Sequence, residues 1–267
     1  MPATTDAADA PTGALDEPHS LGWRIGWALA GFAPFAAVSA VHLGTKFVDG
    51  SPLDAATKVL EIPTLALGLG STLLTTRRKP RAVVAALLFI GLALSWLGDV
   101  TLNTSLAMGL GFFLAAHLAY IAMFQVAFRD RRPSWWGLLA IPWFLALVVL
   151  IGPVLGRMLV PVVLYSAILG LMGVWSTRGT SLTTVGALLF VASDTVLAFR
   201  TFTPRLQTNG WRPVVMATYL AAQLLISLGI LRAEEQRDGQ DLLSRNSGRP
   251  VSSSMVSWPS SANPQFS

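Results

Sequence analysis

Eight apolar segments, each long enough to cross a lipid bilayer as a helix, dominate this chain of 267 residues. A helix needs roughly 20 apolar residues to span the hydrocarbon layer, and only a helix satisfies its own backbone hydrogen bonds there without closing a barrel. These runs are too long for barrel strands, so the sequence predicts an all-α, polytopic membrane bundle. The eight predicted spans are residues 23–43, 53–75, 82–100, 105–128, 135–151, 154–175, 182–199 and 213–231.

The composition agrees with a membrane protein and excludes several kinds of site. Hydrophobic residues make up 53% of the chain and charged residues only 12%, whereas a soluble domain carries about 25% charged residues. The absence of cysteine excludes disulfides, thiolate metal sites and cysteine nucleophiles. With three histidines we expect no metal site, and we expect no cofactor. The net charge of +5 lies largely in short loops, where it indicates orientation and not nucleic-acid binding.

Both ends of the chain differ from the apolar middle. Residues 1–20 are rich in Ala, Thr, Asp and Pro, and lack the basic start and apolar core of a cleavable signal peptide. Residues 233–267 are polar and rich in Ser, Pro and Gln. Because such segments bury little apolar surface, we expect disordered tails at 1–20 and 233–267 around one transmembrane domain, residues 21–232.

Basic residues cluster in two short loops, at 77–81 and 129–132. With eight spans, both loops lie on the same side of the membrane as the two termini. Lys and Arg concentrate in cytoplasmic loops, so the sequence predicts a multi-pass protein of the cell membrane with both termini in the cytoplasm. The last loop on the other side, residues 200–212, is itself basic and reduces this asymmetry.

Two acidic residues interrupt apolar segments: Asp99 near the end of the third span and Asp194 inside the seventh. An ionisable group within a membrane segment is costly to bury and marks a functional site by default. In the eight-span topology both acids lie in the extracytoplasmic half of the bilayer. They are the strongest indication of a site in this chain.

Other polar side chains lie at a similar depth. They are Lys58, Glu61, His117, Tyr120, Tyr219 and Gln223. The histidine and the first tyrosine, spaced i,i+3, share a helix face, as do the second tyrosine and the glutamine, spaced i,i+4. One outward-facing cavity between the second, third, fourth, seventh and eighth spans would collect all of these groups.

Purely structural roles compete with each of these interpretations. Asp99 could cap its helix at the membrane surface, and either acid could pair with a lysine or tyrosine of the bundle. His117 on an apolar face is commonly a hydrogen-bonded packing group. Lys58 could extend to the interface, and we expect Arg200 and Arg205 to meet lipid headgroups.

Residues 94–102 (LSWLGDVTL) are similar to residues 189–197 (LFVASDTVL), four spans later, and this match aligns the two acids. The spans that follow offer residues 116–119 (AHLA) against 218–221 (TYLA). Repeats four spans apart keep the same orientation in the membrane. The similarity suggests a parallel four-plus-four repeat, although composition alone also produces short matches of this kind.

At these residues the chain resembles the YhhN family of membrane proteins, whose characterised members are lysoplasmalogenases. The resemblance runs from about Thr57 to Leu231, and one departure is the run Val100-Thr101-Leu102, where the family has an aliphatic pair after the acid. Its motifs are residues 57–58 (TK), 95–99 (SWLGD), 109–120 (GLGFFLAAHLAY), 186–194 (GALLFVASD) and 218–226 (TYLAAQLLI).

The resemblance implies hydrolysis of the vinyl ether bond of a lysoplasmalogen-type lysophospholipid, which gives a fatty aldehyde and a glycerophospho-base. Such a bond is cleaved by protonating its outer alkene carbon and adding water to the resulting cation. Two carboxyl groups in different environments can divide this work. We expect Asp194, further inside its span, to donate the proton and Asp99 to position water, although these roles could be reversed.

The remaining site residues receive supporting roles in this hypothesis. Lys58 would meet the substrate phosphate as a point charge. The groups that could orient the acids or water are His117, Tyr120, Tyr219 and Gln223. Glu61 is a less favoured third acid.

Other functions fit the same acids. A proton- or cation-coupled transporter or a channel for a small solute would also place carboxyl groups around a polar cavity, and a non-catalytic scaffold is a third reading. No P-loop, zinc motif or serine-hydrolase elbow is present, which argues against nucleotide-driven transport and ordinary ester hydrolysis. The sequence does not indicate an oligomeric state.

Overall fold

The computed structural model describes residues 30–48, 50–75, 79–203 and 210–247, and it is all-helical over these ranges, as predicted. The α-helices are α2 (Ala33–Thr45), α3 (Leu53–Thr75), α4 (Ala82–Thr101), α5 (Leu106–Ala127), α6 (Ala140–Ile151), α7 (Leu159–Ser176), α8 (Ser181–Phe202) and α9 (Trp211–Ser247). Short 3-10 helices cover Trp135–Leu139, Gly152–Val154 and Gly156–Met158. The last two lie where the sequence predicted the boundary between the fifth and sixth spans.

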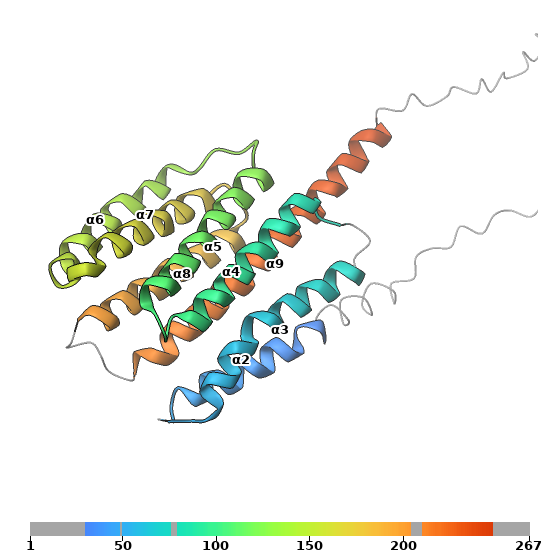
Figure 1. Cartoon of the computed structure of the whole chain (residues 1–267). Helices are drawn as coiled ribbons and strands as arrows, with labels where there is room; N and C mark the ends of the chain where they lie inside the picture. The colour runs from blue at the N-terminus through green and yellow to red at the C-terminus, as the bar shows by residue number, and fades with distance from the viewer. Residues whose placement is uncertain (1–29, 49, 76–78, 204–209, 248–267) are drawn as a thin grey trace, which may run out of the picture.

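The helices form one elongated bundle (Figure 1). The most extensive pairings join α4 to α5 and α8 to α9, and these four helices make up the middle of the bundle. The pair α2 and α3 lies on one side, and α6 and α7 lie on the other (Figure 1). The C-terminal ends of α2, α4 and α8 and the N-terminal ends of α3, α5 and α9 therefore lie at one end of the bundle (Figure 1).

Six helical segments of the described chain are long and apolar enough to cross a membrane. They are Ala82–Thr101, Leu106–Ala127, Trp135–Val154, Gly156–Ser176, Ser181–Phe202 and Trp211–Arg237. The other two helices fall outside this set: α2 has 13 residues, and α3 carries Asp54, Lys58 and Glu61. That α2 and α3 also cross the bilayer, giving eight spans, stays a prediction.

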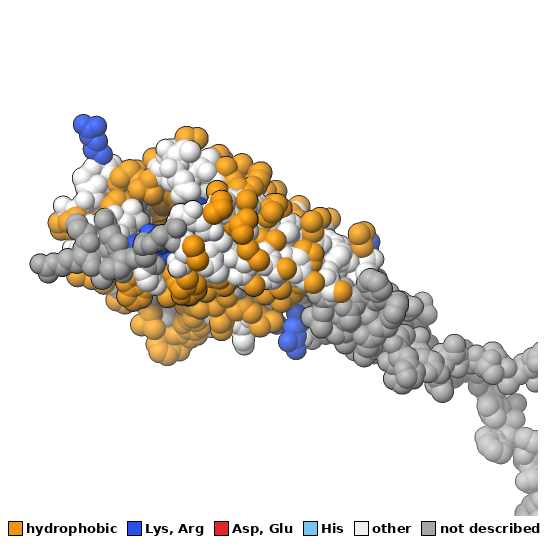
Figure 2. Space-filling model, turned by 90° about the horizontal axis from the view of Figure 1, so that it is seen from below, with side chains coloured by type: hydrophobic (Ala, Val, Ile, Leu, Met, Phe, Trp, Pro, Cys, Tyr) orange, Lys and Arg blue, Asp and Glu red, His pale blue; other side chains and the backbone are white. Residues whose placement is uncertain are grey.

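Side-chain placement has the pattern of a protein surrounded by lipid. Large apolar residues face outward, including Leu74 at 82% exposure and Val149 at 72%, and Figure 2 shows one face covered mostly by hydrophobic side chains, with the visible Lys and Arg side chains toward its ends. Polar side chains such as Glu61, His117 and Gln223 are fully buried. Lipid cannot hydrogen-bond a polar group, so these side chains face the interior of the bundle and not its outer surface.

The N-terminal expectation lies outside the described residues, and the last helix is longer than expected. Residues 1–29, which include the N-terminal tail and the start of the first predicted span, lie outside the described residues; α2 begins at Ala33, with Pro34 in its first turn. At the other end, α9 runs to Ser247 through residues that we expected to belong to a tail starting at residue 233. Figure 1 shows this part of α9 extending beyond the other helices.

An ion pair anchors α9 where it leaves the bundle. Glu234 is 2% exposed and its carboxylate accepts hydrogen bonds from the backbone N–H of Arg81 at 2.9 Å, from its Nε at 3.0 Å and from its Nη2 at 2.7 Å. The same guanidinium donates to the carbonyl of Ala127 at 3.1 Å. This arginine therefore ties the start of α4 and the end of α5 to α9, which explains why the helix continues past the predicted boundary.

Small residues let the paired helices approach closely. A Cβ at Gly186 of α8 would lie 2.9 Å from the backbone nitrogen of Ile226, and one at Gly229 of α9 would lie 2.8 Å from the backbone nitrogen of Thr183. Close backbone approach at small residues is a common mode of helix association in membranes. The α4–α5 and α8–α9 pairs occupy corresponding places in the suggested four-plus-four repeat, and the repeat itself stays a prediction.

Candidate functional site

A cavity of about 490 Å³ lies at the end of the bundle where α2, α4 and α8 end and α3, α5 and α9 begin. Its lining comes from α3, α4, α5, α6, α7, α8 and α9 and from the turn after α2. Among the predicted site residues, the cavity is lined by Lys58, Asp99, Asp194 and Tyr219. The structure thus brings both acids to one cavity.

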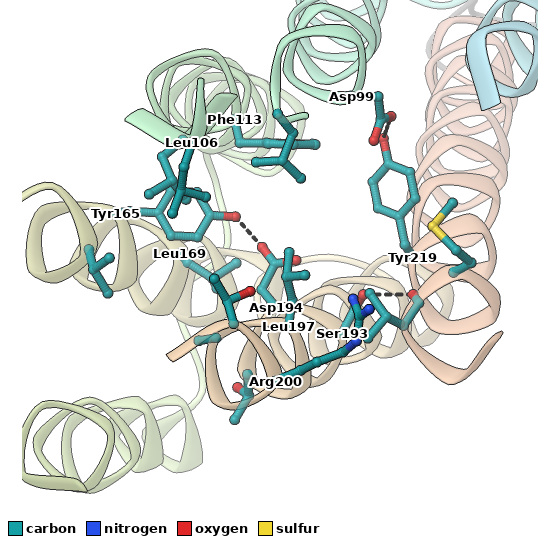
Figure 3. Close-up of a pocket in the computed structure, with 18 of the residues that line it drawn as sticks. Asp99, Leu106, Phe113, Tyr165, Leu169, Ser193, Asp194, Leu197, Arg200 and Tyr219 are labelled. Carbon is teal, nitrogen blue, oxygen red and sulfur yellow. Dashed lines mark hydrogen bonds between the residues drawn. The ribbon is translucent and has the colours of Figure 1, made fainter. Parts of the chain in front are cut away.

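Asp99 lies near the end of α4, but it does not cap that helix. The helix continues to Thr101, whose hydroxyl donates to the carbonyl of Leu97 at 2.7 Å. The Asp99 side chain turns inward and is 6% exposed. Its Oδ2 accepts a hydrogen bond of 2.6 Å from the hydroxyl of Tyr219 on α9 (Figure 3). The carboxyl group is therefore held across the α4–α9 contact.

Asp194 is held in a similar way on the opposite side of the site. Its Oδ2 accepts a hydrogen bond from the hydroxyl of Tyr165 on α7 (Figure 3). Neighbouring residues fix α8 here: Ser193 donates to the carbonyl of Val215 on α9 at 2.8 Å, and Thr195 accepts from Trp143 Nε1 on α6 at 3.1 Å. Each acid thus has one tyrosine from another helix as its partner.

Sequence reasoning missed Tyr165. A signal was available, because the chain contains only three tyrosines and all of them lie inside apolar segments: Tyr120, Tyr165 and Tyr219. A buried tyrosine hydroxyl nearly always has a hydrogen-bond partner. A search for partners of the two acids among these three residues would therefore have included it.

An aromatic floor closes the cavity from the interior of the bundle. It consists of Phe113, His117, Tyr165, Phe190 and Tyr219. The ring of His117 lies 4.7 Å from that of Phe190 and 5.4 Å from that of Tyr165, and the rings of Phe190 and Tyr219 are 5.4 Å apart, all edge to face. Tyr219 meets Phe113 at 6.1 Å. The floor links the two aspartate–tyrosine pairs through packed rings.

His117 belongs to this floor and does not line the cavity. It is fully buried, and its Nδ1 lies 2.5 Å from the carbonyl of Phe113 one turn earlier. Its Nε2 has no hydrogen-bond partner among the described residues. The geometry supports packing of the floor as its contribution.

Tyr120 and Gln223 lie one turn further from the cavity than the floor residues on their helices. Tyr120 donates to Gln223 Oε1 at 2.7 Å, and both are fully buried. They join α5 to α9 and do not line the cavity. No hydrogen bond joins either residue to Asp99 or Asp194 among the described residues, and both lie in the layer beneath the floor.

Glu61 also stays outside the cavity lining. It is fully buried in α3, and neither carboxyl oxygen has a hydrogen-bond partner among the described residues. Its Oε1 lies 3.7 Å from Nε2 of His42, whose Nδ1 is 2.7 Å from the hydroxyl of Thr57. This acid–histidine pair packs between α2 and α3.

Positive charge gathers on the α3, α8 and α9 side of the cavity. The basic lining residues are Lys46, Lys58, Arg200 and Arg212, and the acidic residue among them is Asp54. The acid is shared, since Lys46 Nζ and Arg212 Nη2 both contact its carboxylate, the second at 3.3 Å. Burial lowers the pKa of Lys46, in the turn after α2, while its bond to Asp54 acts in the opposite direction.

The α5, α6 and α7 side of the same cavity is apolar. Its lining residues include Leu106, Leu110, Trp143, Leu147, Val162 and Leu169. The two aspartate–tyrosine pairs lie between this apolar side and the basic side. Such an arrangement suits an amphiphile with an anionic end, whose reacting bond would lie next to the carboxyl groups. No cluster of three metal-ligating side chains occurs within the described ranges.

Comparisons with known proteins agree with this architecture. The sequence pattern of the YhhN family matches residues 53–230, which include every helix that lines the cavity. The chain is 37% identical over 167 residues to human lysoplasmalogenase TMEM86B, covering 58% of this chain and 68% of that protein. It is 37% identical over 134 residues to the rat protein of the same name, covering 47% of this chain and 52% of the relative. No solved structure matches. The chain is a multi-pass membrane protein that belongs to the YhhN family.

Proposed function

We propose that this protein hydrolyses the vinyl ether bond of lysoplasmalogen-type lysophospholipids within the bilayer, releasing a fatty aldehyde and a glycerophospho-base. The observation that carries the proposal is the two-sided cavity, in which two carboxyl groups lie between a basic and an apolar wall. Membership of the YhhN family and the similarity to two lysoplasmalogenases support the same function. A lipid with its phosphate at the basic wall and its chain at the apolar wall would hold the vinyl ether, which joins the chain to the glycerol, beside the two acids.

The reaction needs one proton donor and one group that guides water. A carboxylic acid donates its proton to the outer alkene carbon, and the positive charge is shared between the inner carbon and the ether oxygen. Water then adds to the inner carbon and gives up a proton to the second carboxylate. The hemiacetal that results breaks its bond to the glycerol oxygen, which leaves the aldehyde and the free hydroxyl. A proton returns to the first acid through water, so both carboxyl groups are restored.

We assign the proton donation to Asp194 and the positioning of water to Asp99. Depth in the helix does not support this choice, because Asp99 is the more buried side chain and Asp194 is partly exposed toward the cavity. The residues around each acid support this assignment instead. Asp99 shares its end of the cavity with Lys58, and nearby positive charge favours an ionised carboxyl group. Asp194 borders the apolar wall, where the alkenyl chain would enter.

The two tyrosines keep the carboxyl groups in position in this mechanism. A hydrogen bond from Tyr219 leaves one oxygen of Asp99 available for water, and the bond from Tyr165 does the same for Asp194. Positioned acids and bases of this kind typically contribute 10²–10⁴-fold to a rate. Loss of either carboxyl group should therefore reduce turnover by at least about a hundredfold.

The test is aldehyde release by purified protein given a lysoplasmalogen or the matching acyl lysolipid. We expect aldehyde from the vinyl ether only, and its loss in D194N and D99N. The control is D130N, which removes an acid that is 88% exposed at the opposite end of the bundle. Retained turnover in D194N would remove that residue from the mechanism. No aldehyde release from the vinyl ether by the wild-type protein would overturn the proposed hydrolase activity.

A conduit for a solute or proton would use the cavity differently. It would need a path from the cavity to the opposite end of the bundle. The aromatic floor and the buried residues beneath it, among them Leu65, Leu88, Met123 and Phe124, fill that direction. We therefore prefer the hydrolase, and solute flux in liposomes without aldehyde release would favour the transporter.

A further inference from the structure

Arg200 in the last turn of α8 has a position that the proposed reaction does not use. The sequence led us to expect this residue at lipid headgroups, but its side chain lines the cavity. Figure 3 shows it extended toward Ser193 and α9. Its Nε is buried without a hydrogen-bond partner, and the side chain forms no ion pair among the described residues.

An unneutralised guanidinium in such a setting is costly. The buried Nε loses its hydrogen bonds to water, and no counter-charge or hydrogen bond among the described residues replaces them. The local acid cannot supply this, because the carboxylate of Asp54 is already shared by Lys46 and by Arg212. The basic side of the cavity therefore has more cations than carboxylates, and Arg200 pairs with no acid among the described residues.

Arg212 in the first turn of α9 lines the same cavity. It comes from a different helix than Arg200, so two planar guanidinium groups border one space. Guanidinium groups bind phosphate oxygens through pairs of parallel hydrogen bonds, which a lysine ammonium cannot do. Two of them on one side of an amphiphile cavity fit an anionic headgroup better than a neutral one, and the anion of a lysophospholipid is its phosphate.

We propose that Arg200 and Arg212 form a phosphate clamp, which holds the phosphodiester of a lysophospholipid while its chain lies against the apolar wall. The reaction at the vinyl ether rests on the proposed function, but the clamp requires only a phosphate-bearing single-chain lipid. It fixes the polarity of the bound lipid, with the phosphate beside α8 and α9 and the chain beside α5, α6 and α7. It also makes the phosphate, and not the headgroup base, the feature that the protein selects.

The experiment compares two vinyl ether substrates that differ only in the phosphate. One is a lysoplasmalogen and the other is the 1-alkenylglycerol without phosphate. We expect wild-type protein to prefer the first in kcat/KM, and R200Q to reduce that preference about tenfold or more, since charge-assisted hydrogen bonds are lost. R200K should keep part of the preference. The matched control is R157Q, an exposed arginine at the same end that does not line the cavity.

A binding measurement separates the clamp from the chemistry. Acyl lysophospholipid and monoacylglycerol, neither of which has a vinyl ether, are titrated while tryptophan fluorescence is followed, because Trp143 lines the cavity. We expect R200Q to weaken only the phosphate-bearing ligand, even if no aldehyde is ever released. Competition by inorganic phosphate at millimolar concentration would show that the clamp binds free phosphate, and its absence would show that the chain is needed as well.

Three results would overturn the clamp. In the first, R200Q weakens both ligands equally. In the second, R157Q has the same effect as R200Q. In the third, wild-type protein binds monoacylglycerol as tightly as the phosphate-bearing lipid. Thermal unfolding of each variant in detergent identifies misfolded protein, and R200K then replaces R200Q as the informative variant.

Discussion

The two carboxyl groups of the cavity each accept a hydrogen bond from one tyrosine on a different helix, and this pairing is the central residue-scale feature of the protein. Tyr219 contacts Asp99, and Tyr165 contacts Asp194. A hydroxyl at this position both orients the carboxyl group and replaces part of its lost solvation. A Tyr-to-Phe substitution can therefore test the hydrogen bond while the aspartate itself is unchanged.

Replacing Tyr219 by Phe should lower kcat about tenfold or more while the chain stays folded. The change removes one hydroxyl and keeps the ring that packs against Phe113 and Phe190. A hydrogen bond to a charged group is worth about 1.5–3 kcal/mol, and each 1.4 kcal/mol is about tenfold in rate. Initial rates of aldehyde release at saturating substrate measure the effect.

The comparison for that variant is Y120F. Its hydroxyl bonds Gln223 beneath the aromatic floor and does not reach the cavity. Both substitutions remove one buried hydrogen bond, so both should cost about 1–3 kcal/mol of stability, but Y120F should reduce kcat much less. A larger loss of turnover in Y120F than in Y219F would place the chemistry beneath the floor and contradict the proposed site.

Replacing the two buried glutamates should change the stability of the protein in opposite directions. Glu61 has no hydrogen-bond partner on either oxygen among the described residues, whereas Glu234 accepts three hydrogen bonds from Arg81. Leucine at position 61 should raise the unfolding temperature, because a buried polar group without a partner is destabilising. Leucine at position 234 should lower stability by about 1–3 kcal/mol, because it removes the hydrogen bonds that Arg81 donates to the carboxylate.

Thermal unfolding in detergent compares these two variants directly, and turnover gives the second reading. A stabilised but inactive E61L protein would identify Glu61 as a group retained for function at the expense of stability. Destabilisation of E61L comparable to that of E234L would contradict the prediction that the unpartnered carboxyl group of Glu61 is destabilising.

At the scale of the helices, the α8–α9 pair depends on glycines that have no room for a side chain. A Cβ at Gly186 would lie 2.9 Å from the backbone nitrogen of Ile226 and 3.0 Å from the carbonyl oxygen of Ala222. Backbone atoms cannot move aside as a flexible side chain can. G186A should therefore force α8 away from α9 and displace Asp194, which lies two turns further along α8.

The expected result is a loss of about 1–3 kcal/mol in stability from overpacking, accompanied by reduced turnover. G111A on the outer face of α5 is the matched control, since nothing lies within 4 Å of a Cβ there. Alanine favours helix over glycine by about 1 kcal/mol, so the control should be neutral or stabilised. Thermal unfolding and turnover are measured for both variants. An unchanged unfolding temperature and turnover in G186A would show that α8 and α9 can separate freely.

The packing of the helices also explains which parts of the site could be predicted from the sequence. Asp99, Asp194 and Tyr219 could be located because an ionisable or polar group in an apolar segment stands out, and helix periodicity assigns it a face and a depth. Periodicity does not say which neighbour that face meets. Tyr165 was missed for this reason, and His117 was expected in the cavity although it packs beneath it.

The basic wall of the cavity needed tertiary structure for the same reason. Lys46 and Arg212 are far apart in the chain, and only the packing of α2 against α3 and α9 brings both to Asp54. Arg200 looked like an interfacial residue because it lies at the end of an apolar run. The extension of α9 was likewise missed, since its anchor is the contact of Glu234 with Arg81, more than a hundred residues earlier.

For the whole molecule, the two ends of the bundle have different roles. The cavity lies at the end where α2, α4 and α8 end and α3, α5 and α9 begin. The opposite end holds Arg81, Arg129 and Arg178 with the C-terminal part of α9. Since Lys and Arg are retained in cytoplasmic loops, the sequence-based topology places the second end in the cytoplasm. The cavity would then receive lipid from the outer leaflet.

Single cysteines can test this orientation, because the chain has none of its own. Thr104 lies exposed in the turn between α4 and α5 at the cavity end, and Asp130 lies exposed after α5 at the other end. Neither is a Lys or Arg, so the substitutions T104C and D130C leave the basic charges that set the topology unchanged. Both positions lie outside the helices, and neither residue lines the cavity.

We expect a membrane-impermeant maleimide to label T104C in intact cells and to label D130C only after the membrane is permeabilised. Labelling of the denatured proteins gives the full signal for each variant, and aldehyde release confirms that each is folded. The reverse pattern would place the cavity in the cytoplasmic leaflet. Substrate added to the outside of intact cells would then have to cross the bilayer first, so turnover should lag behind its addition in whole cells and not in permeabilised ones.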